Sequence, residues 1–189
     1  VLFRSLMPRH GYSAIFERIL DHPNIEIQLD HAFSRGIERD YDASFLSVPI
    51  DEYYAECFGP LPYRSIRFEH ITRAKQPGMS WTVTNYTDSS PWTRETAWHL
   101  LPHHDNGLPT GPHTREEPCD YKDNEFERYY PVRTSDGRFQ KVYEQYAELA
   151  GETPQITFIG RCGLYQYLDM HQVINQSLQG VRRWLATHG

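Results

Sequence analysis

The chain has 189 residues, of which 39% are hydrophobic and 14% aromatic, and it carries a formal net charge of −6 at pH 7. This composition is typical of a globular protein with one sizeable core or two small ones, which argues against a disordered chain. The negative charge argues against a nucleic-acid binder that needs a basic face, so any phosphate site has to be local.

Cysteine usage and hydropathy indicate the cellular context. Three cysteines, Cys57, Cys119 and Cys162, form no CxxC pair, and no apolar run approaches the length of a membrane span. An odd number of thiols suits a reduced protein better than a disulfide framework. We therefore expect a soluble, cytoplasmic protein without a membrane span.

The chain opens on an irregular stretch and then a helix. Residues 1–5, VLFRS, match the translation of a common sequencing adapter, so we expect them to be a foreign junction. Apolar residues recur at helical spacing between positions 14 and 20, which predicts a short amphipathic helix with Ser13 as its N-cap.

Two strands and a short helix follow. The alternation in residues 24–29 predicts a half-exposed strand, and residues 41–48 predict a strand of more buried character. Pro49 then begins a short helix that Gly59 and Pro60 close.

The middle of the chain changes to a period of two. Three alternating runs, at residues 63–69, 81–86 and 92–98, are separated by turn clusters and predict an antiparallel sheet with one wet face. Residues 100–118 are rich in proline, glycine and histidine, so we expect a loop there, ending in a strand near residues 119–122.

A group of histidines in this part of the chain raises the question of a metal site. The side chains concerned are His99, His103, His104 and His113, with Asp105 and Cys119 nearby in the sequence. Pro102 breaks any helix that would align His99 with His103, and the spacings match no zinc pattern. We expect a solvated loop and no metal.

The last third of the chain returns to mixed structure. Residues 128–131 predict an extended segment, because Pro131 disfavours helix at Tyr130. A helix is predicted from Ser135 or Asp136 to Gly151, and residues 155–159 predict a buried strand.

A long final helix is predicted from Met170 to about Ala186, with one apolar stripe. The turn between the preceding strand and this helix carries Arg161, Tyr165, Tyr167 and Asp169. Such turns are where open α/β sheets place ligands, because a helix N-terminus offers free N–H groups. The alternative is an ordinary capped helix with a surface arginine and two packing tyrosines.

The order of elements predicts the fold class. An α/β segment is followed by an antiparallel sheet and then by α/β structure again, which predicts an α/β fold with an inserted antiparallel β-sheet. The interrupted α/β part is typical of a discontinuous nucleotide-binding domain.

Arg94 is the first candidate site residue. It lies inside a predicted strand, where alternation gives it a face shared with Trp92 and Thr96. An arginine fork beside aromatic planes can bind a diphosphate through two hydrogen bonds. The alternative is an exposed strand arginine paired with a glutamate.

Seven motifs in one order carry a family resemblance. They are His10-Gly-Tyr12, Pro49-Ile-Asp-Glu-Tyr-Tyr54, Tyr63-Arg-Ser-Ile-Arg-Phe-Glu69, Asn85-Tyr-Thr-Asp88, Trp92-Thr-Arg94, Arg128-Tyr-Tyr-Pro131, and Gly160-Arg161 with Tyr165-Gln-Tyr-Leu-Asp-Met170. Together they cover most of residues 10–181, and the chain resembles the C-terminal half of the UDP-galactopyranose mutases.

The resemblance implies a flavoenzyme of galactofuranose biosynthesis, an isomerase that interconverts UDP-galactopyranose and UDP-galactofuranose for cell-surface polysaccharide. The cofactor implied is FAD in its reduced form, whose N5 attacks the anomeric carbon to give a flavin–sugar adduct. The fold implied is a fragment of a discontinuous, Rossmann-like FAD-binding flavoprotein. Residues 1–50 and 131–189 would belong to the FAD-binding domain, and residues 51–130 to a substrate-side sheet domain.

The resemblance also implies residue roles. Arg94 would clamp the diphosphate and neutralise the leaving group, as the catalytic residue, and Tyr130 and Tyr167 would donate hydrogen bonds to the same phosphates. The residues implied to sit against the flavin are Arg161, Asp169 and Met170. The oligomeric state stays open, with a homodimer among the options.

The chain departs from the family pattern in places. Ser89-Ser90 shortens the stretch before Pro91, and Ala97 stands where the family has a glutamate three residues past the arginine. The glycine-rich flavin-pyrophosphate loop and a second diphosphate arginine would precede residue 1. We therefore expect this chain to be inactive by itself.

Two other interpretations stay open. The chain could be part of an amine-oxidase-like FAD oxidoreductase, which would have no use for a diphosphate clamp of Arg94, Tyr130 and Tyr167. It could also be a sugar-binding module that stacks glycans on an aromatic sheet face; the residues concerned are Trp81, Tyr86, Trp92 and Trp98.

Overall fold

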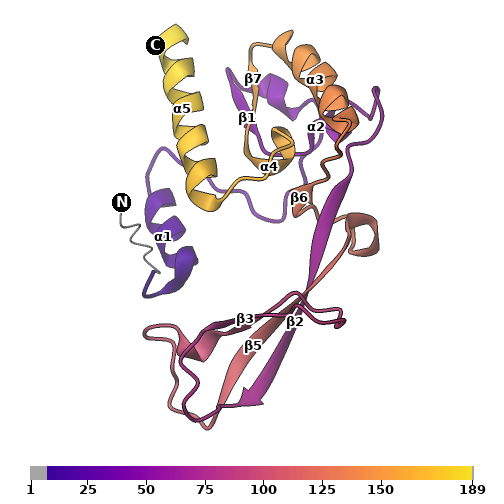
Figure 1. Cartoon of the computed structure of the whole chain (residues 1–189). Coiled ribbons are helices and arrows are strands. Elements are labelled where there is room, and N and C mark those ends of the chain that lie inside the picture. The colour runs from indigo at the N-terminus through magenta and orange to yellow at the C-terminus, as the bar shows by residue number, and fades with distance from the viewer. Residues whose placement is uncertain (1–7, 189) are drawn as a thin grey trace, which may run out of the picture.

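The computed structural model describes residues 8–188, so the junction expected at residues 1–5 lies outside the described residues. An elongated antiparallel sheet extends from a part in which helices surround two parallel strands (Figure 1). The fold is thus an α/β structure with an antiparallel sheet between its two sequence segments, as the order of predicted elements indicated.

The parallel pair is formed by segments far apart in the sequence. Strand β1 (Ser44–Leu46) pairs with β7 (Ile156–Phe158), with Ser44 opposite Ile156 and Leu46 opposite Phe158. Both strands match predicted ones, with shorter bounds. Their carboxyl ends therefore lie side by side, and the chain leaves them into α2 (Ile50–Tyr53) and α4 (Gly160–Gly163).

Tyrosines fill much of the core around this pair. The buried residues are Leu46, Ile50, Tyr53, Tyr54, Leu61, Tyr63, Tyr121, Tyr146, Ile156, Phe158 and Tyr165. The hydroxyl of Tyr146 on α3 (Arg138–Gly151) donates to the carbonyl of Gly59 at 2.8 Å, and the hydroxyl of Tyr63 donates to the carbonyl of Cys162 at 3.2 Å. A buried hydroxyl without a partner would cost free energy, so these bonds allow large polar aromatics inside the core.

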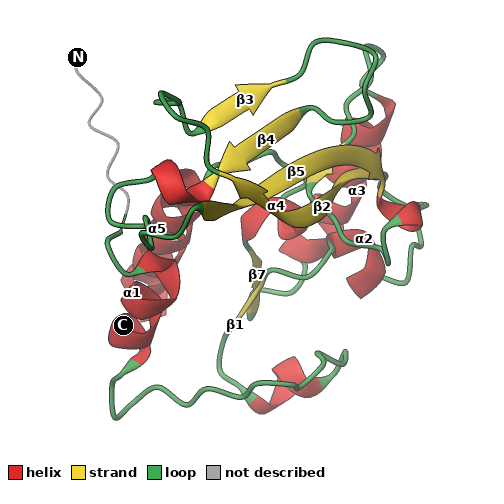
Figure 2. Cartoon of the chain, turned by 90° about the horizontal axis from the view of Figure 1, so that it is seen from below, coloured by secondary structure: helices red, strands yellow, loops and turns green. Residues whose placement is uncertain are grey.

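The antiparallel sheet has five strands in the order β3-β4-β5-β2-β6. Figure 2 shows β3, β4, β5 and β2 side by side. Its bounds are β2 (Tyr63–Ala74), β3 (Val83–Asn85), β4 (Arg94–Ala97), β5 (Thr110–Asp120) and β6 (Tyr130–Pro131). Strands β2 and β5 pair along all 11 residues of β5, from Arg64 opposite Asp120 to Ala74 opposite Thr110. Short 3-10 helices η2 (Trp98–Leu100) and η3 (Tyr121–Asp123) flank β5, and η1 (Ile37–Asp40) precedes β1.

The loop expected at residues 100–118 is wrong, because β5 begins at Thr110. Pro112 and Pro118 suggested irregular structure, but both lie outside residues 113–116, the part of β5 that pairs with β4. At these two positions β5 has one partner strand, as an edge strand does, and proline is tolerated there.

The strand expected at residues 24–29 is also wrong. This segment is irregular and exposed, with Leu29 at 81% exposure. Alternation alone does not make a strand, because the backbone groups need a neighbouring strand, and within residues 8–188 none lies beside them.

The two end helices expose their apolar sides. Helix α1 (Gly11–Leu20) begins before Ser13, so Ser13 is not its N-cap, and no residue of α1 is buried. Helix α5 (Met170–His188) follows the predicted bounds and buries only Gly180 within the described residues. Both helices lie on one side of the α/β part (Figures 1 and 2). No helix within residues 8–188 is long and apolar enough to cross a membrane.

Candidate functional site

Arg94 lies on one face of the five-stranded sheet and is held there by a carboxylate. Its Nε and Nη2 groups donate to Glu116 Oε1 and Oε2 at 2.8 and 2.7 Å. The two residues are directly opposite each other on β4 and β5, so their side chains share a face. The hydrogen bonds to Glu116 raise the pKa of Arg94, which keeps the guanidinium charged.

Three predicted site residues line one cavity on this face. The cavity has a volume of about 290 Å³, and its walls are Ile66, Asn85, Thr93, Arg94, Glu116, Tyr129, Tyr130 and Tyr167. Arg94, Tyr130 and Tyr167 come from β4, β6 and the turn before α5, which are distant in sequence. The fold thus brings together the arginine and both tyrosines that the sequence singled out.

The two tyrosine hydroxyls are available to a ligand. Within residues 8–188, neither Tyr130 nor Tyr167 hydrogen-bonds to protein through its hydroxyl, and Tyr167 is 54% exposed. The two rings meet edge to face, with centroids 6.3 Å apart. A guanidinium and two free hydroxyls around one small cavity form a set of donors suited to phosphate oxygens.

Arg161 builds the wall behind these tyrosines. Its Nε donates to the carbonyl of Leu168 at 2.6 Å, and its Nη1 donates to the carbonyl of Tyr129 at 2.9 Å. Its guanidinium also lies 4.6 Å from the ring centroid of Tyr167 and 5.1 Å from that of Tyr129. Arg161 therefore ties the turn before α5 to the residue that precedes β6, and it orients the Tyr167 ring.

The turn that carries Tyr167 is itself strained and anchored. Tyr165 adopts a left-handed backbone, with φ at 46°, and its side chain is buried. Its hydroxyl lies 2.9 Å from the carbonyl of Pro62 and 2.8 Å from that of Val132. Burial raises the pKa of Tyr165, so it acts here as a neutral structural group.

Asp169 and Met170 mark the start of α5, next to the same turn. The amide of Asp169 donates to Gln172 Oε1 at 2.7 Å, and the carbonyl of Asp169 accepts from the amides of Gln172 and Val173. Within residues 8–188, the amides of Met170 and His171 take no partner. This exposed helix start offers N–H donors to an electron-rich group.

Two features of the site differ from the sequence prediction. Trp92 precedes β4, and its ring lies against the guanidinium of Arg115, at 5.2 Å, on the other side of the sheet from Arg94. Alternation holds only within a strand, so Trp92 does not share the face of Arg94. Glu116, the partner of Arg94, was missed because the segment that carries it was expected to be a loop.

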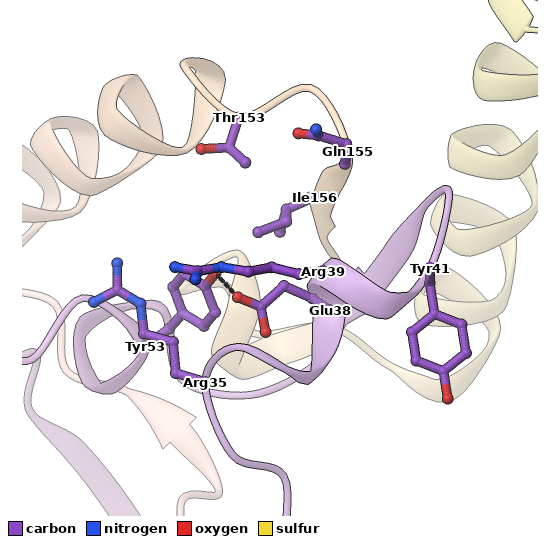
Figure 3. A pocket seen from close by; sticks show the side chains of 8 residues that line it. All are labelled: Arg35, Glu38, Arg39, Tyr41, Tyr53, Thr153, Gln155 and Ile156. Carbon is purple, nitrogen blue, oxygen red and sulfur yellow. Dashed lines mark hydrogen bonds between the residues drawn. The ribbon is translucent and has the colours of Figure 1, made fainter.

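A further cavity lies at the opposite, amino-terminal ends of β1 and β7 (Figure 3). It has a volume of about 320 Å³ and is lined by Arg35, Glu38, Arg39, Tyr41, Tyr53, Thr153, Gln155 and Ile156. The hydroxyl of Tyr53 donates to Glu38 Oε1 at 2.9 Å, and Arg35 lies against the ring of Tyr53, at 5.0 Å. No predicted site residue lines this cavity.

The chain is similar in sequence to known mutases. A family model described as UDP-galactopyranose mutase matches residues 4–167. A probable UDP-galactopyranose mutase of Klebsiella pneumoniae is 34% identical over 186 residues, covering 96% of this chain and 46% of the relative. A dTDP-fucopyranose mutase of Escherichia coli is 32% identical over 181 residues, covering 92% of this chain and 47% of the relative.

A UDP-galactopyranose mutase of Mycoplasma pneumoniae is 29% identical over 187 residues, covering 91% of this chain and 46% of the relative. The chain thus spans about half the length of the curated relatives it matches. All of these relatives are named mutases, which does not favour the amine-oxidase-like alternative.

Proposed function

The chain belongs to the UDP-galactopyranose mutase family, and from this premise we propose that the whole protein is a flavin-dependent isomerase that interconverts UDP-galactopyranose and UDP-galactofuranose. The observation that carries this proposal is the cavity that Arg94 shares with Tyr130 and Tyr167. These three donors suit the diphosphate of a nucleotide sugar.

Arg94 is proposed to bind the diphosphate and to stabilise it as the leaving group. Cleavage of the bond between the anomeric carbon and the phosphate oxygen places negative charge on that oxygen. A guanidinium already oriented by Glu116 meets this charge with little reorganisation, which is the condition under which a fixed donor accelerates a reaction. Arg94 lines the cavity, and its remaining N–H groups make no hydrogen bond within residues 8–188, so they are available to phosphate.

Tyr130 and Tyr167 are proposed to donate hydrogen bonds to the same phosphates. Their hydroxyls make no hydrogen bond to protein within residues 8–188. The guanidinium of Arg161 packs against the ring of Tyr167 and fixes its orientation. Both tyrosines hold the diphosphate in the same place before and after its bond to the sugar breaks, so it stays ready to recombine with the sugar. An isomerase needs this, because the departed group has to return to the same carbon.

Arg161, Asp169 and Met170 are proposed to lie against FAD in its reduced form. The amides at the start of α5 would stabilise negative charge on the ring system. When bound, the reduced flavin supplies the nucleophilic nitrogen for the anomeric carbon. The chain's own part is to orient the sugar through its diphosphate. Its residues also stabilise the negative charge of the leaving diphosphate and that of the flavin ring.

The α/β part of this chain is proposed to be one section of a discontinuous FAD-binding domain. Residues up to 50 and from 131 onward form it, and residues 51–130 form the substrate-side sheet. The apolar sides of α1 and α5 are exposed here. We propose that the rest of the whole protein covers these apolar sides. We further propose that the protein is cytoplasmic and forms a homodimer.

A second substrate is a candidate because of one observation. The dTDP-fucopyranose mutase is nearly as similar to this chain as the Klebsiella relative is, at 32% against 34% identity. The test is to incubate the whole protein, with its flavin reduced, with UDP-galactopyranose and with dTDP-fucopyranose, and to follow furanose formation by chromatography. Faster turnover of the uridine sugar supports the proposal. Faster turnover of the thymidine sugar would mean that dTDP-fucopyranose, and not UDP-galactopyranose, is the substrate of the proposed mutase. If neither sugar is converted, the proposed function is wrong.

A further inference from the structure

The face of the five-stranded sheet that points away from Arg94 carries a second polar cluster. Glu95, directly next to Arg94 on β4, points to this face and is opposite Arg115 on β5. His113 lies two residues before Arg115 and therefore points to the same face. The proposed diphosphate site uses none of these three side chains.

The carboxylate of Glu95 is buried and surrounded by donors. Its Oε1 accepts from His113 Nδ1 at 2.9 Å, and its Oε2 accepts from the hydroxyl of Tyr86 at 2.8 Å and from Arg115 Nε at 3.0 Å. Arg73 on β2 adds a looser ion pair, at 3.5 Å from Oε1. Arg115 also pairs with Glu69 on β2, at 3.4 Å. The two arginines thus balance the charges of Glu95 and Glu69, and the oxygens of Glu95 have little capacity left for a ligand.

His113 is the opposite case, because one of its nitrogens has no partner. An ionised carboxylate only accepts hydrogen bonds, so Nδ1 carries a proton and donates it to Glu95. The other nitrogen, Nε2, is buried and has no hydrogen-bond partner among the described residues, although the His113 side chain is only 6% exposed. A buried polar atom left without a partner costs free energy unless something else supplies one.

The ring of His99 in η2 packs closely against the backbone of Gly111 and lies beside the ring of His113. The two rings lie with centroids 5.2 Å apart, and His99 is 4% exposed. A Cβ at Gly111 would lie 2.2 Å from His99 Nδ1, so only glycine at this position lets the imidazole pack there. Nδ1 of His99 also has no hydrogen-bond partner among the described residues.

Both histidines line one cavity of about 200 Å³. The residues that line it are Arg73, Ala74, Gln76, Met79, Trp81, Thr84, Tyr86, Glu95, His99 and His113. We propose that this cavity is a binding site for an oxyanion, the phosphate or carboxylate group of a small molecule, with His113 Nε2 and the guanidinium of Arg73 as its principal donors.

The charges around the cavity favour an anion over a metal ion. Arg73 lines the cavity and would repel a cation, and within residues 8–188 no group of three His, Cys, Asp or Glu side chains is arranged to hold a metal. A neutral imidazole offers Nε2 only as an acceptor, whereas an imidazolium offers it as a donor. An oxyanion therefore binds together with a proton on His113, and its affinity increases as the pH falls.

Several other polar groups surround His113. The charged and titratable groups that face or surround it are Glu95 on β4, Tyr86 after β3, Glu69 and Arg73 on β2, Arg115 on β5 and His99 in η2. Two carboxylates and two arginines thus lie on this face of the sheet.

The test is calorimetric titration of the 189-residue chain with inorganic phosphate and, separately, with acetate. Arg94→Gln is used as the background, so that the cavity around Arg94 does not contribute and the result is independent of the proposed mutase activity. We expect one site per chain that binds either anion, with an affinity that increases as the pH falls. Side-chain nitrogen NMR of His113 should show the Nε2 signal shifting as the anion is added.

Variants separate this site from general attraction of anions to the surface. His113→Asn keeps a donor for Glu95 and removes Nε2, and Arg73→Gln removes the charge; each should weaken phosphate binding by about tenfold or more. Arg182→Gln, at an exposed arginine of α5, is the matched control and should leave the affinity unchanged. Far-ultraviolet circular dichroism confirms that each variant is folded.

Three results would overturn the proposal. The first is unchanged phosphate affinity in the folded His113→Asn variant. The second is a loss of phosphate affinity in the Arg182→Gln control as large as the loss in the His113→Asn and Arg73→Gln variants. The third is stoichiometric binding of Zn²⁺ that displaces the anion.

Discussion

Arg94 and Glu116 form a bidentate pair across β4 and β5, with Nε 2.8 Å from Oε1 and Nη2 2.7 Å from Oε2. A pair of this geometry fixes the plane of the guanidinium, which a single hydrogen bond does not. The orientation of the proposed diphosphate clamp therefore depends on a residue that need not touch the substrate.

Glu116→Gln should reduce both substrate affinity and turnover, because an amide cannot accept both guanidinium hydrogen bonds. The side chain of Arg94 is 44% exposed, so after solvent screening the loss of folding stability should be only about 1 kcal/mol. The matched control is Glu117→Gln, the next residue, which forms an exposed pair with Arg67. If both variants keep full activity, Glu116 does not position Arg94.

Tyr167→Phe should weaken binding of UDP without changing the fold. It removes one hydroxyl that has no protein partner, and a hydrogen bond of this kind contributes about 0.5–1.5 kcal/mol, or up to about tenfold in affinity. Titration calorimetry of the whole protein with UDP measures the change, with Tyr41→Phe, an exposed tyrosine remote from this cavity, as the control. Identical UDP affinity for wild type and Tyr167→Phe would remove Tyr167 from the site.

Gly163→Ala should destabilise the α/β part by about 1–3 kcal/mol. A Cβ at Gly163 would lie 3.0 Å from the carbonyl oxygen of Leu46 and 3.3 Å from Cβ of Phe158, so β1 and β7 would have to shift. Gly151→Ala is the control, because a Cβ there meets nothing within 4 Å, and in α3 it should be neutral or stabilising. Urea unfolding followed by circular dichroism compares the two. Equal stability of the two variants would contradict the close packing at Gly163.

Asp51 should give stability a dependence on acidic pH. Burial raises its pKa above the ordinary 3.8, although the hydrogen bond from the Leu61 amide at 2.8 Å acts in the other direction. The folded protein then holds the proton in a range where the unfolded chain has lost it. The free energy of unfolding therefore falls as the pH rises from about 3.8 to the raised value.

Asp51→Asn should lack the pH-dependent contribution of this carboxyl to the free energy of unfolding. The difference in that free energy between variant and wild type should therefore change between about pH 3.8 and the raised pKa of Asp51, and stay constant above it. Urea unfolding at a series of pH values measures the difference. The exposed Asp42→Asn variant is the control and should show no such change. A difference independent of pH throughout would mean that Asp51 titrates normally.

Several elements could be predicted because their signals are local. The apolar stripe of α5, the strand β7 ahead of Gly160, and the extended segment at Pro131 each follow from periodicity or from the backbone limits of proline. The convergence of Arg94, Tyr130 and Tyr167 was implied by the resemblance to a family, since no local pattern relates residues so far apart in the sequence.

The missed elements depend on pairing between distant segments. Strand β5 exists because β2 pairs along its whole length, and this pairing overrides the preference of Pro112 and Pro118 for loops. Residues 24–29 have strand-like alternation but no neighbouring strand within the described residues. Glu116 and the histidines His99 and His113 could not be placed for the same reason, since their positions follow from the register of β5.

The most direct test of the account is the effect of Arg94→Lys on the whole, flavin-loaded protein. The variant keeps the positive charge but loses the fork that Glu116 orients, so conversion of UDP-galactofuranose to UDP-galactopyranose by the reduced protein should fall by about 10²-fold. Flavin absorbance should be unchanged, and oxidised wild type should not convert the sugar. Conversion at the wild-type rate by Arg94→Lys, or equal conversion by oxidised and reduced wild-type protein, would contradict the account.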